Sequence, residues 1–220
     1  MSVIESRLAP NSEEFKANAA AMHKLVDQFR GIERQVIDAA AKKAGRYRER
    51  GLIPPRERLG LLLDPGTPFL ELATLCGYLQ EGDRDGSAAG GSTIGGIGYI
   101  ANTRCLVAVD DYLTKGGSFT ELGMVKRQRL MAIALEQKLP LVCLAQSGGG
   151  NLAMAGDFFG ASGAGFAAQA RLSAAGIPQI TVVHGAATAG GAYQPGLSDY
   201  VIMIRNQSTM YLAGPPLLKA

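Results

Sequence analysis

The chain has 220 residues, of which 47% are hydrophobic and 19% charged, and its formal net charge is +3. This composition supports a sizeable core, excludes an intrinsically disordered chain, and gives no reason to expect a nucleic-acid-binding protein. Every apolar run is too short to span a membrane, and the first ten residues lack the apolar core of a secretory signal, so we expect a cytoplasmic protein.

Residues 12–50 are predicted to form one long helix. Apolar residues recur there at steps of three and four, Asn11 with Glu14 suits an N-terminal capping pair, and Gly51 ends the pattern. Residues 1–60 carry 12 basic and 8 acidic side chains, which is typical of a solvated helix face or a subunit contact. We treat 1–60 as an N-terminal helical extension.

Residues 61–220 are predicted to form an α/β domain around a buried sheet. Residues 56–72 suit a short helix, a Pro-Gly turn and a strand, and 81–92 form a polar, Gly-rich loop. Strands are then expected at 94–100, 104–109, 139–145, 178–184, 199–204 and 208–212. Helices are expected between them at 118–138, 160–175 and 189–196, an alternation typical of α/β proteins. The last residues, LAGPPLLKA, stop just after a strand, so we expect this domain to be incomplete at its C-terminal end.

Two glycine-rich loops are the strongest candidates for a functional site. Residues 146–151, QSGGGN, follow the strand PLVCLA, and residues 185–193, GAATAGGAY, follow the strand ITVVH. Exposed backbone N–H groups at such strand ends suit an anion or a developing oxyanion. Two such loops after neighbouring parallel strands could converge on one carbonyl group. The structural alternative is a tight turn that requires a positive φ.

A dinucleotide site is weakly indicated by the same sequence. Residues 148–153 satisfy a loose GxGxxA fingerprint, but so do residues 96–101, where no helix follows. The ribose-binding acid expected about 20 residues further on is replaced by Arg171. The phosphate-binding pattern GxxxxGK[ST] is absent from the sequence.

A serine hydrolase is a further alternative. Ala145-x-Ser147-x-Gly149 is similar to a nucleophile elbow, and Asp157 and His184 are the available triad partners. His184 lies at a strand end, where a histidine is more often a packing or capping residue.

The segment Lys115-Gly116-Gly117-Ser118 suits a phosphate group as well as a solvated loop. Asp110 and Asp111 form a carboxylate pair that we expect to be a solvent-exposed strand end, because no other metal-type cluster supports them. The three cysteines form no CxxC pair, so we expect reduced thiols and no metal in this chain.

The chain resembles the carboxyltransferase (beta) subunits of biotin-dependent acyl-CoA carboxylases. The resemblance covers roughly residues 22–220 and is strongest in RERLGLLLDPGTPFLEL, TKGGS, SGGGNL, QARLSAAGIPQITVVHGAATAGGAYQPGLSDYVIMI and TMYLAGPPLLKA. It is closest to the methylcrotonoyl-CoA and geranyl-CoA carboxylase type, and it reaches only the first of that family's two domains.

This resemblance implies a crotonase-like fold (the ClpP/crotonase superfamily), a spiral of β-β-α units, with a long N-terminal helix. It implies that CO2 moves from carboxybiotin, held on a partner carrier, to an acyl-CoA, in a homo-oligomer that works with a biotin carboxylase subunit. The backbone oxyanion donors would be Gly149, Gly150, Gly190 and Gly191. The CoA and acyl contacts would be Lys115, Gly116, Gly117, Ser147, Gly148, Ala189 and Phe166. Without the biotin-binding second domain, we expect this chain alone to be inactive.

One departure concerns the acyl group. Residues 153–166 are richer in Ala and Gly than the corresponding segment of the family, which would leave volume in a pocket lined by Met154, Phe158, Phe159 and Phe166. Such a pocket favours a longer or branched acyl chain, whereas a surface loop would have no such effect. Two other functions stay open: a crotonase-type hydratase or hydrolase, for which Asp157 is the only nearby acid, and an inactive assembly fragment.

Overall fold

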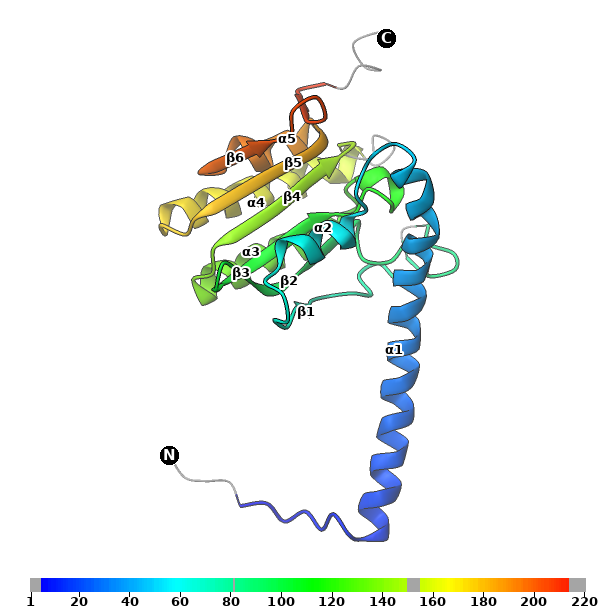
Figure 1. Cartoon of the computed structure of the whole chain (residues 1–220). Coiled ribbons are helices and arrows are strands. Elements are labelled where there is room, and N and C mark those ends of the chain that lie inside the picture. Colours follow the sequence, from blue (N-terminus) through cyan, green and yellow to red (C-terminus); the bar gives the residue numbers. More distant parts are fainter. Residues whose placement is uncertain (1–4, 81, 150–154, 214–220) are drawn as a thin grey trace.

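The computed structural model describes residues 5–80, 82–149 and 155–213, with the backbone alone for 155–162. Its centre is one twisted sheet (Figure 1) in which six strands lie side by side in chain order. These are β1 (Leu70–Glu71), β2 (Thr93–Ile100), β3 (Thr103–Asp110), β4 (Leu141–Ser147), β5 (Gln179–Thr188) and β6 (Tyr200–Met203). A seventh strand, β7 (Thr209–Tyr211), pairs with the far end of β5.

The sheet is mixed. The pairs β1–β2 and β2–β3 are antiparallel, whereas β3, β4, β5 and β6 run parallel. The connections between the parallel strands contain the helices α3 (Glu121–Gln137), α4 (Ala155–Ala174) and α5 (Gly190–Gly196). This arrangement brings the carboxyl ends of β3, β4 and β5 to one edge of the sheet, where ligands of parallel sheets usually bind.

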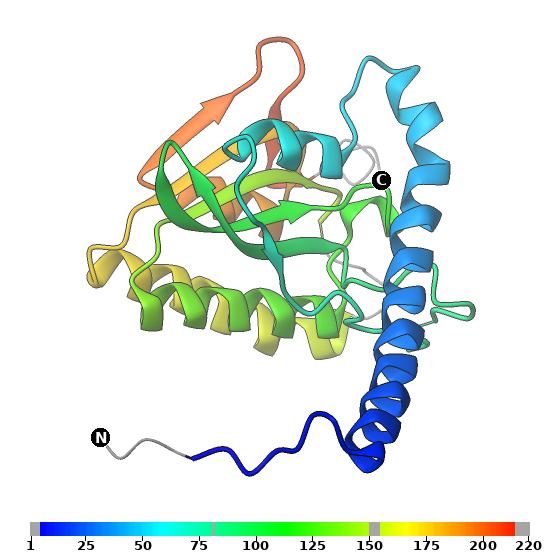
Figure 2. The same cartoon turned by 60° about the horizontal axis from the view of Figure 1, so that its bottom comes forward.

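Alternating side chains of the central strands pack against two different layers. Leu106 and Leu141 belong to a cluster with Leu130 of α3 and Leu172 of α4. Figure 2 shows α3 and α4 together beneath one face of the sheet. The next residue along each strand points to the other face: Val107, which follows Leu106, packs there with Leu59 of α2 (Pro55–Leu62). The two-residue period of a strand therefore supplies both cores.

Helix α1 (Glu13–Arg48) is the long helix expected at the N-terminus, and its N-terminal half projects beyond the body (Figures 1 and 2). Only Val36, Ala44 and Tyr47 are buried in it. Its N-cap is Ser12, whose Oγ accepts a hydrogen bond from the Phe15 N–H at 3.1 Å, so the Asn11 capping pair is wrong. Ser12 offers the same short side-chain acceptor one residue later.

The expected elements from 94 onward are confirmed, with two corrections. Helix α4 begins at Ala155, so the described part of the alanine- and glycine-rich segment is a helix and not a surface loop. The sheet is not buried throughout, because all four residues of the edge strand β6 are exposed. Across the part of the chain that the structure describes, no helix is both long enough and apolar enough to span a membrane.

Candidate active site

The two predicted glycine loops meet at the carboxyl edge of the sheet. Strand β4 ends at Ser147 and β5 at Thr188, and the pairing between them shifts so that Ser147 lies opposite Ala187. A Cβ atom placed on Gly191 would lie 3.0 Å from the Ser147 Cβ, and one placed on Gly149 would lie 3.4 Å from the Thr188 carbonyl oxygen. The two loops therefore lie side by side, as the sequence predicted, while their convergence on one carbonyl group stays a prediction.

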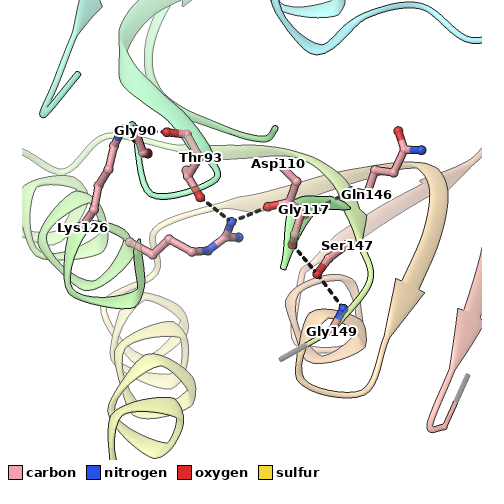
Figure 3. A network of polar contacts seen from close by, with 9 residues as sticks. Gly90, Thr93, Asp110, Gly117, Lys126, Gln146, Ser147 and Gly149 are labelled. Carbon is pink, nitrogen blue, oxygen red and sulfur yellow. Dashed lines mark hydrogen bonds and ion pairs between the residues drawn. The ribbon is translucent and has the colours of Figure 1, made fainter. Parts of the chain in front are cut away.

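A third glycine segment holds the first loop. The Ser147 hydroxyl donates to the Gly117 carbonyl at 3.0 Å, and the Gly148 N–H donates to the Gly116 carbonyl at 3.3 Å (Figure 3 shows the first of these bonds). Gly117 has a φ of +65°, and a Cβ there would lie 2.6 Å from the Gln146 carbonyl oxygen. Only glycine fits this position.

The hydroxyl of Ser147 also accepts a hydrogen bond from the Gly149 N–H at 3.1 Å. The expected oxyanion donor Gly149 is thus engaged within its own loop, and it would have to exchange this partner for a ligand oxygen. Gly150, the neighbouring expected donor, lies outside the described residues.

The second loop begins with a strained residue. Ala189 has φ +49° and ψ −120°, a conformation that costs a non-glycine residue of order 1–3 kcal/mol. Its N–H donates to the Tyr211 carbonyl at 2.9 Å. Within the described residues, the N–H groups of Gly190 and Gly191 have no hydrogen-bond acceptor, and a Cβ on Gly190 would meet no atom within 4 Å. Among the residues that the structure describes, this turn therefore leaves two adjacent amides without an acceptor, as an anion-binding turn would.

A buried ion pair lies behind the first loop. The carboxylate of Asp110 pairs with Arg127 of α3 and accepts the Gln146 N–H at 3.0 Å. Asp110 is only 3% exposed, so its expected position in solvent is wrong. The apolar surroundings of β3 leave a carboxylate stable there only when it is paired. Figure 3 shows Asp110 between α3 and the end of β4.

A second buried cluster joins α1 and α2 to the same loop. The Gln146 Oε1 accepts hydrogen bonds from the Tyr47 hydroxyl and from Arg58 at 2.7 Å, and Arg58 also donates to the Tyr47 oxygen at 2.8 Å. Burial raises the pKa of Tyr47 and lowers that of Arg58. No sequence pattern pointed to Arg127, Tyr47 or Arg58, and the buried role of Asp110 was missed, because each acts through a partner far away in the chain.

The structure does not assemble a hydrolase triad from the described residues. The Ser147 hydroxyl donates to a carbonyl group, and the His184 Nε2 is buried without a partner in the described part of the chain. Burial, together with the Arg58 charge, lowers the pKa of His184 to about 4, so its imidazole is neutral near pH 7. The Asp157 side chain lies outside the described residues.

An apolar cavity adjoins the second loop. It has a volume of about 60 Å³, lies between α3, α4 and α5, and is bordered by Phe119, Met124, Phe166 and Gly190 among others. The Phe166 ring stacks on Tyr193 with 4.3 Å between ring centres. Phe166 is therefore near Gly190, whereas the side chains of Met154, Phe158 and Phe159 lie outside the described residues.

Lys115 is exposed at the start of η1 (Lys115–Gly117), beside the first loop. The cysteines are free, and burial raises the pKa of Cys143 to about 12, which leaves its thiol unreactive at neutral pH. In the described ranges no group of three His, Cys, Asp or Glu side chains could hold a metal ion.

A family model, the carboxyl transferase domain, matches residues 46–220. A probable mitochondrial methylcrotonoyl-CoA carboxylase beta chain of Drosophila melanogaster is 42% identical over 99% of this chain and 38% of its own length. A probable biotin-dependent acyl-coenzyme A carboxylase beta2 subunit of Mycobacterium tuberculosis is 38% identical over 99% of this chain and 40% of its own length.

Two solved structures are similar over most of the chain. The beta subunit of Pseudomonas aeruginosa geranyl-CoA carboxylase superposes with a TM-score of 0.87 at 52% identity, over 98% of this chain and 40% of its own. The transcarboxylase 12S hexamer with hydrolysed methylmalonyl-coenzyme A has a TM-score of 0.79 at 27% identity. That match covers 90% of this chain and 39% of the transcarboxylase chain. The crotonase-like fold is thereby confirmed. The chain spans about 40% of the length of these relatives.

Proposed function

Because the chain belongs to the carboxyl transferase domain family, we propose that it is the acyl-CoA-binding part of a biotin-dependent acyl-CoA carboxylase. The observation that supports this most directly is the close approach of the two glycine loops, in which Gly191 lies against the Ser147 side chain. In this proposal residues 1–60 are a helical extension, and residues 61–220 belong to the carboxyltransferase N-domain.

The second loop stabilises the negative charge that the reaction creates. Carboxylation requires removal of a proton from a carbon acid of the acyl group, and this places charge on the thioester oxygen. The N–H groups of Gly190 and Gly191, which have no acceptor within the described residues, donate to that oxygen. Removal of one such donor typically costs about 10²–10³ in rate. Gly149 and Gly150 supply donors from the first loop.

The substrate lies across the three glycine segments. The CoA side is formed by two segments that are hydrogen-bonded to each other, Ser147 to Gly117 and Gly148 to Gly116. It comprises Lys115, Gly116, Gly117, Ser147 and Gly148. Ala189 and Phe166 form the acyl side, beside the apolar cavity. The carboxyl group comes from carboxybiotin on a partner subunit, and we assign no described residue to biotin and none to the role of general base.

The acyl group is branched or longer than propionyl. An apolar cavity beside Gly190 would take part of such a chain, and each buried CH2 contributes about 0.8 kcal/mol. The 52% identity to the geranyl-CoA carboxylase beta subunit supports the same choice. We further propose that the protein acts in the cytoplasm as a homo-oligomer with a biotin-carrying partner, although several relatives are named as mitochondrial.

The proposal is tested by carboxyl transfer in the assembled enzyme. The complete subunit is combined with its biotin carboxylase partner, ATP, labelled bicarbonate and acyl-CoAs of increasing length. Acid-stable label in the acyl-CoA supports it. Thioester hydrolysis or hydration without labelling would favour another crotonase-type enzyme, and no reaction of any acyl-CoA would favour an assembly role.

A further inference from the structure

The side-chain amide of Gln194 is a buried hydrogen-bond donor without a partner. Gln194 lies on α5, four residues after Gly190, and is only 8% exposed. Its Nε2 atom is buried and has no hydrogen-bond acceptor within the described residues. Buried donors in folded proteins are nearly always paired, because an unpaired one lowers stability. An exception beside a candidate active site therefore points to a functional role.

Gln194 lies where two cavities meet. One is the apolar cavity of about 60 Å³ beside Gly190, and the other, of about 10 Å³, is bordered by the buried Leu141 and Cys143. Gln194 borders both cavities. A water molecule needs a cavity of about 10–15 Å³ and two or more polar partners. The smaller cavity is at the lower limit of that size, so the larger one has the room for an acceptor of the amide.

The backbone at Gln194 is fixed by other glutamines. Its carbonyl oxygen accepts hydrogen bonds from the Gln169 Nε2 at 3.2 Å and from the Ser198 hydroxyl at 2.7 Å. The Gln179 Nε2 donates in turn to the Gln169 carbonyl at 3.0 Å. These bonds tie α5 to α4 and to β5 at this residue. The amide therefore extends from a fixed point, which lowers the cost of ordering it around a ligand.

The surroundings of the amide favour a neutral acceptor over an anion. Arg127 is the one ionisable residue among the described residues that border the larger cavity, and its charge is paired with Asp110. A carboxylate placed there would be a buried charge without a counter-ion. A hydroxyl or keto oxygen accepts an N–H bond without adding charge. The apolar part of the lining, which includes Phe119, Met131 and Phe166, suits a hydrocarbon chain.

We propose that Gln194 selects acyl groups that carry a neutral oxygen near their far end, such as a hydroxyl or a keto group. The inference rests on the proposed function and refines its substrate class. The thioester lies at Gly190 and Gly191, the chain enters the cavity beside Gly190, and the Gln194 Nε2 donates a hydrogen bond to the distal oxygen. The ligand thus supplies the acceptor that the described residues do not.

The first test measures selectivity in the assembled enzyme. Each acyl-CoA of about six to ten carbons that the enzyme carboxylates is compared with its counterpart bearing a keto oxygen on the last carbon but one. For at least one chain length the keto compound should have the higher kcat/KM, and Gln194→Leu should lower the ratio of the two values by about tenfold or more. The matched control, Gln137→Leu, removes an exposed amide of α3 outside the cavity and should leave the ratio unchanged.

A second measurement shows whether the amide is unpaired in the free protein. Gln194→Met, which has a similar volume and no amide, should leave the midpoint of denaturant unfolding of the complete protein unchanged or raise it, because it removes an unpaired donor. A lowered midpoint would show that the amide has a structural partner, and it would overturn the inference.

Calorimetric titration of the complete protein with the same acyl-CoAs separates this inference from the proposed function. Tighter binding of the keto chain that Gln194→Leu abolishes and Gln137→Leu retains would support the role of Gln194 even if no acyl-CoA were carboxylated. Equal losses on both chains in Gln194→Leu would overturn it. So would a wild type that prefers the keto chain at no length, the result expected if an ordered water were the only partner of the amide.

Discussion

Ser147 and Gly191 lie against each other where β4 and β5 end. A Cβ atom on Gly191 would lie 3.0 Å from the Ser147 Cβ and 3.2 Å from its Oγ. The two loops therefore meet with no room for a side chain at position 191, and Gly191 is held beside the first loop.

Ser147→Ala should lower the rate of carboxyl transfer by less than about tenfold. In our account Ser147 holds the loop through its bonds to Gly117 and Gly149, and it takes no part in bond making. Loss of these bonds should also lower the free energy of unfolding by about 1–3 kcal/mol. Steady-state kinetics and denaturant titration check both values. A rate loss of about three to six orders of magnitude would identify Ser147 as a nucleophile and would contradict the proposed carboxyltransferase function.

Asp110→Asn should destabilise the protein by about 3–5 kcal/mol, because it leaves the Arg127 charge buried without its partner. The matched control is Glu136→Gln, which removes the exposed ion pair with Arg129 and should change stability by less than about 1 kcal/mol. Denaturant titration of the complete protein measures both. Equal effects of the two variants would show that Asp110 does not anchor Arg127 and the first loop.

His184 should make the protein less stable in acid. Its pKa is about 4 in the folded chain and 6.5 when unfolded, so between these values the unfolded state binds more protons. Stability should therefore fall as the pH drops from 6.5 toward 4, and His184→Gln should reduce that loss. Melting temperatures across this range measure it, with His23→Gln on exposed α1 as the control. A difference between wild type and His184→Gln that does not vary with pH would contradict the lowered pKa.

Gly165→Leu should shift substrate preference toward shorter acyl chains. Gly165 borders the apolar cavity, and a Cβ there would meet no atom within 4 Å, so the new side chain can occupy the cavity. We expect kcat/KM for chains of about six to ten carbons to fall about tenfold relative to propionyl-CoA.

The control for this prediction is Gly163→Leu, two residues earlier on α4, where the glycine is exposed and does not border the cavity. It should leave the ratio unchanged. A wild-type preference for acetyl- or propionyl-CoA over the longer chains would defeat the assignment of a large acyl pocket without affecting the family assignment.

The sequence was most informative where the signal is local. The apolar periodicity of α1 and the alternation of strands and helices predicted the described elements, and small residues after two strands predicted where the loops would meet. These signals depend on neighbours within a few residues, which is what periodicity and turn chemistry report.

The support of the site could not be predicted, because it comes from distant partners. Tyr47 reaches Gln146 across 99 residues, and Arg58 reaches it across 88. From the sequence alone, Asp110 was expected at a solvent-exposed strand end. Its burial follows from the ion pair with Arg127 of α3, which is distant in the chain.

The central claim is that the amides of Gly190 and Gly191 stabilise the thioester oxyanion. Its most direct test is carboxyl transfer by Gly191→Val in the assembled enzyme, measured together with CoA affinity. We predict that transfer falls by about 10²-fold or more while CoA still binds, because the new side chain meets Ser147 where the thioester approaches. The matched control is Gly196→Val on the same helix, which should retain transfer because a Cβ atom at Gly196 would meet no atom within 4 Å. Unchanged turnover in Gly191→Val would contradict the oxyanion role.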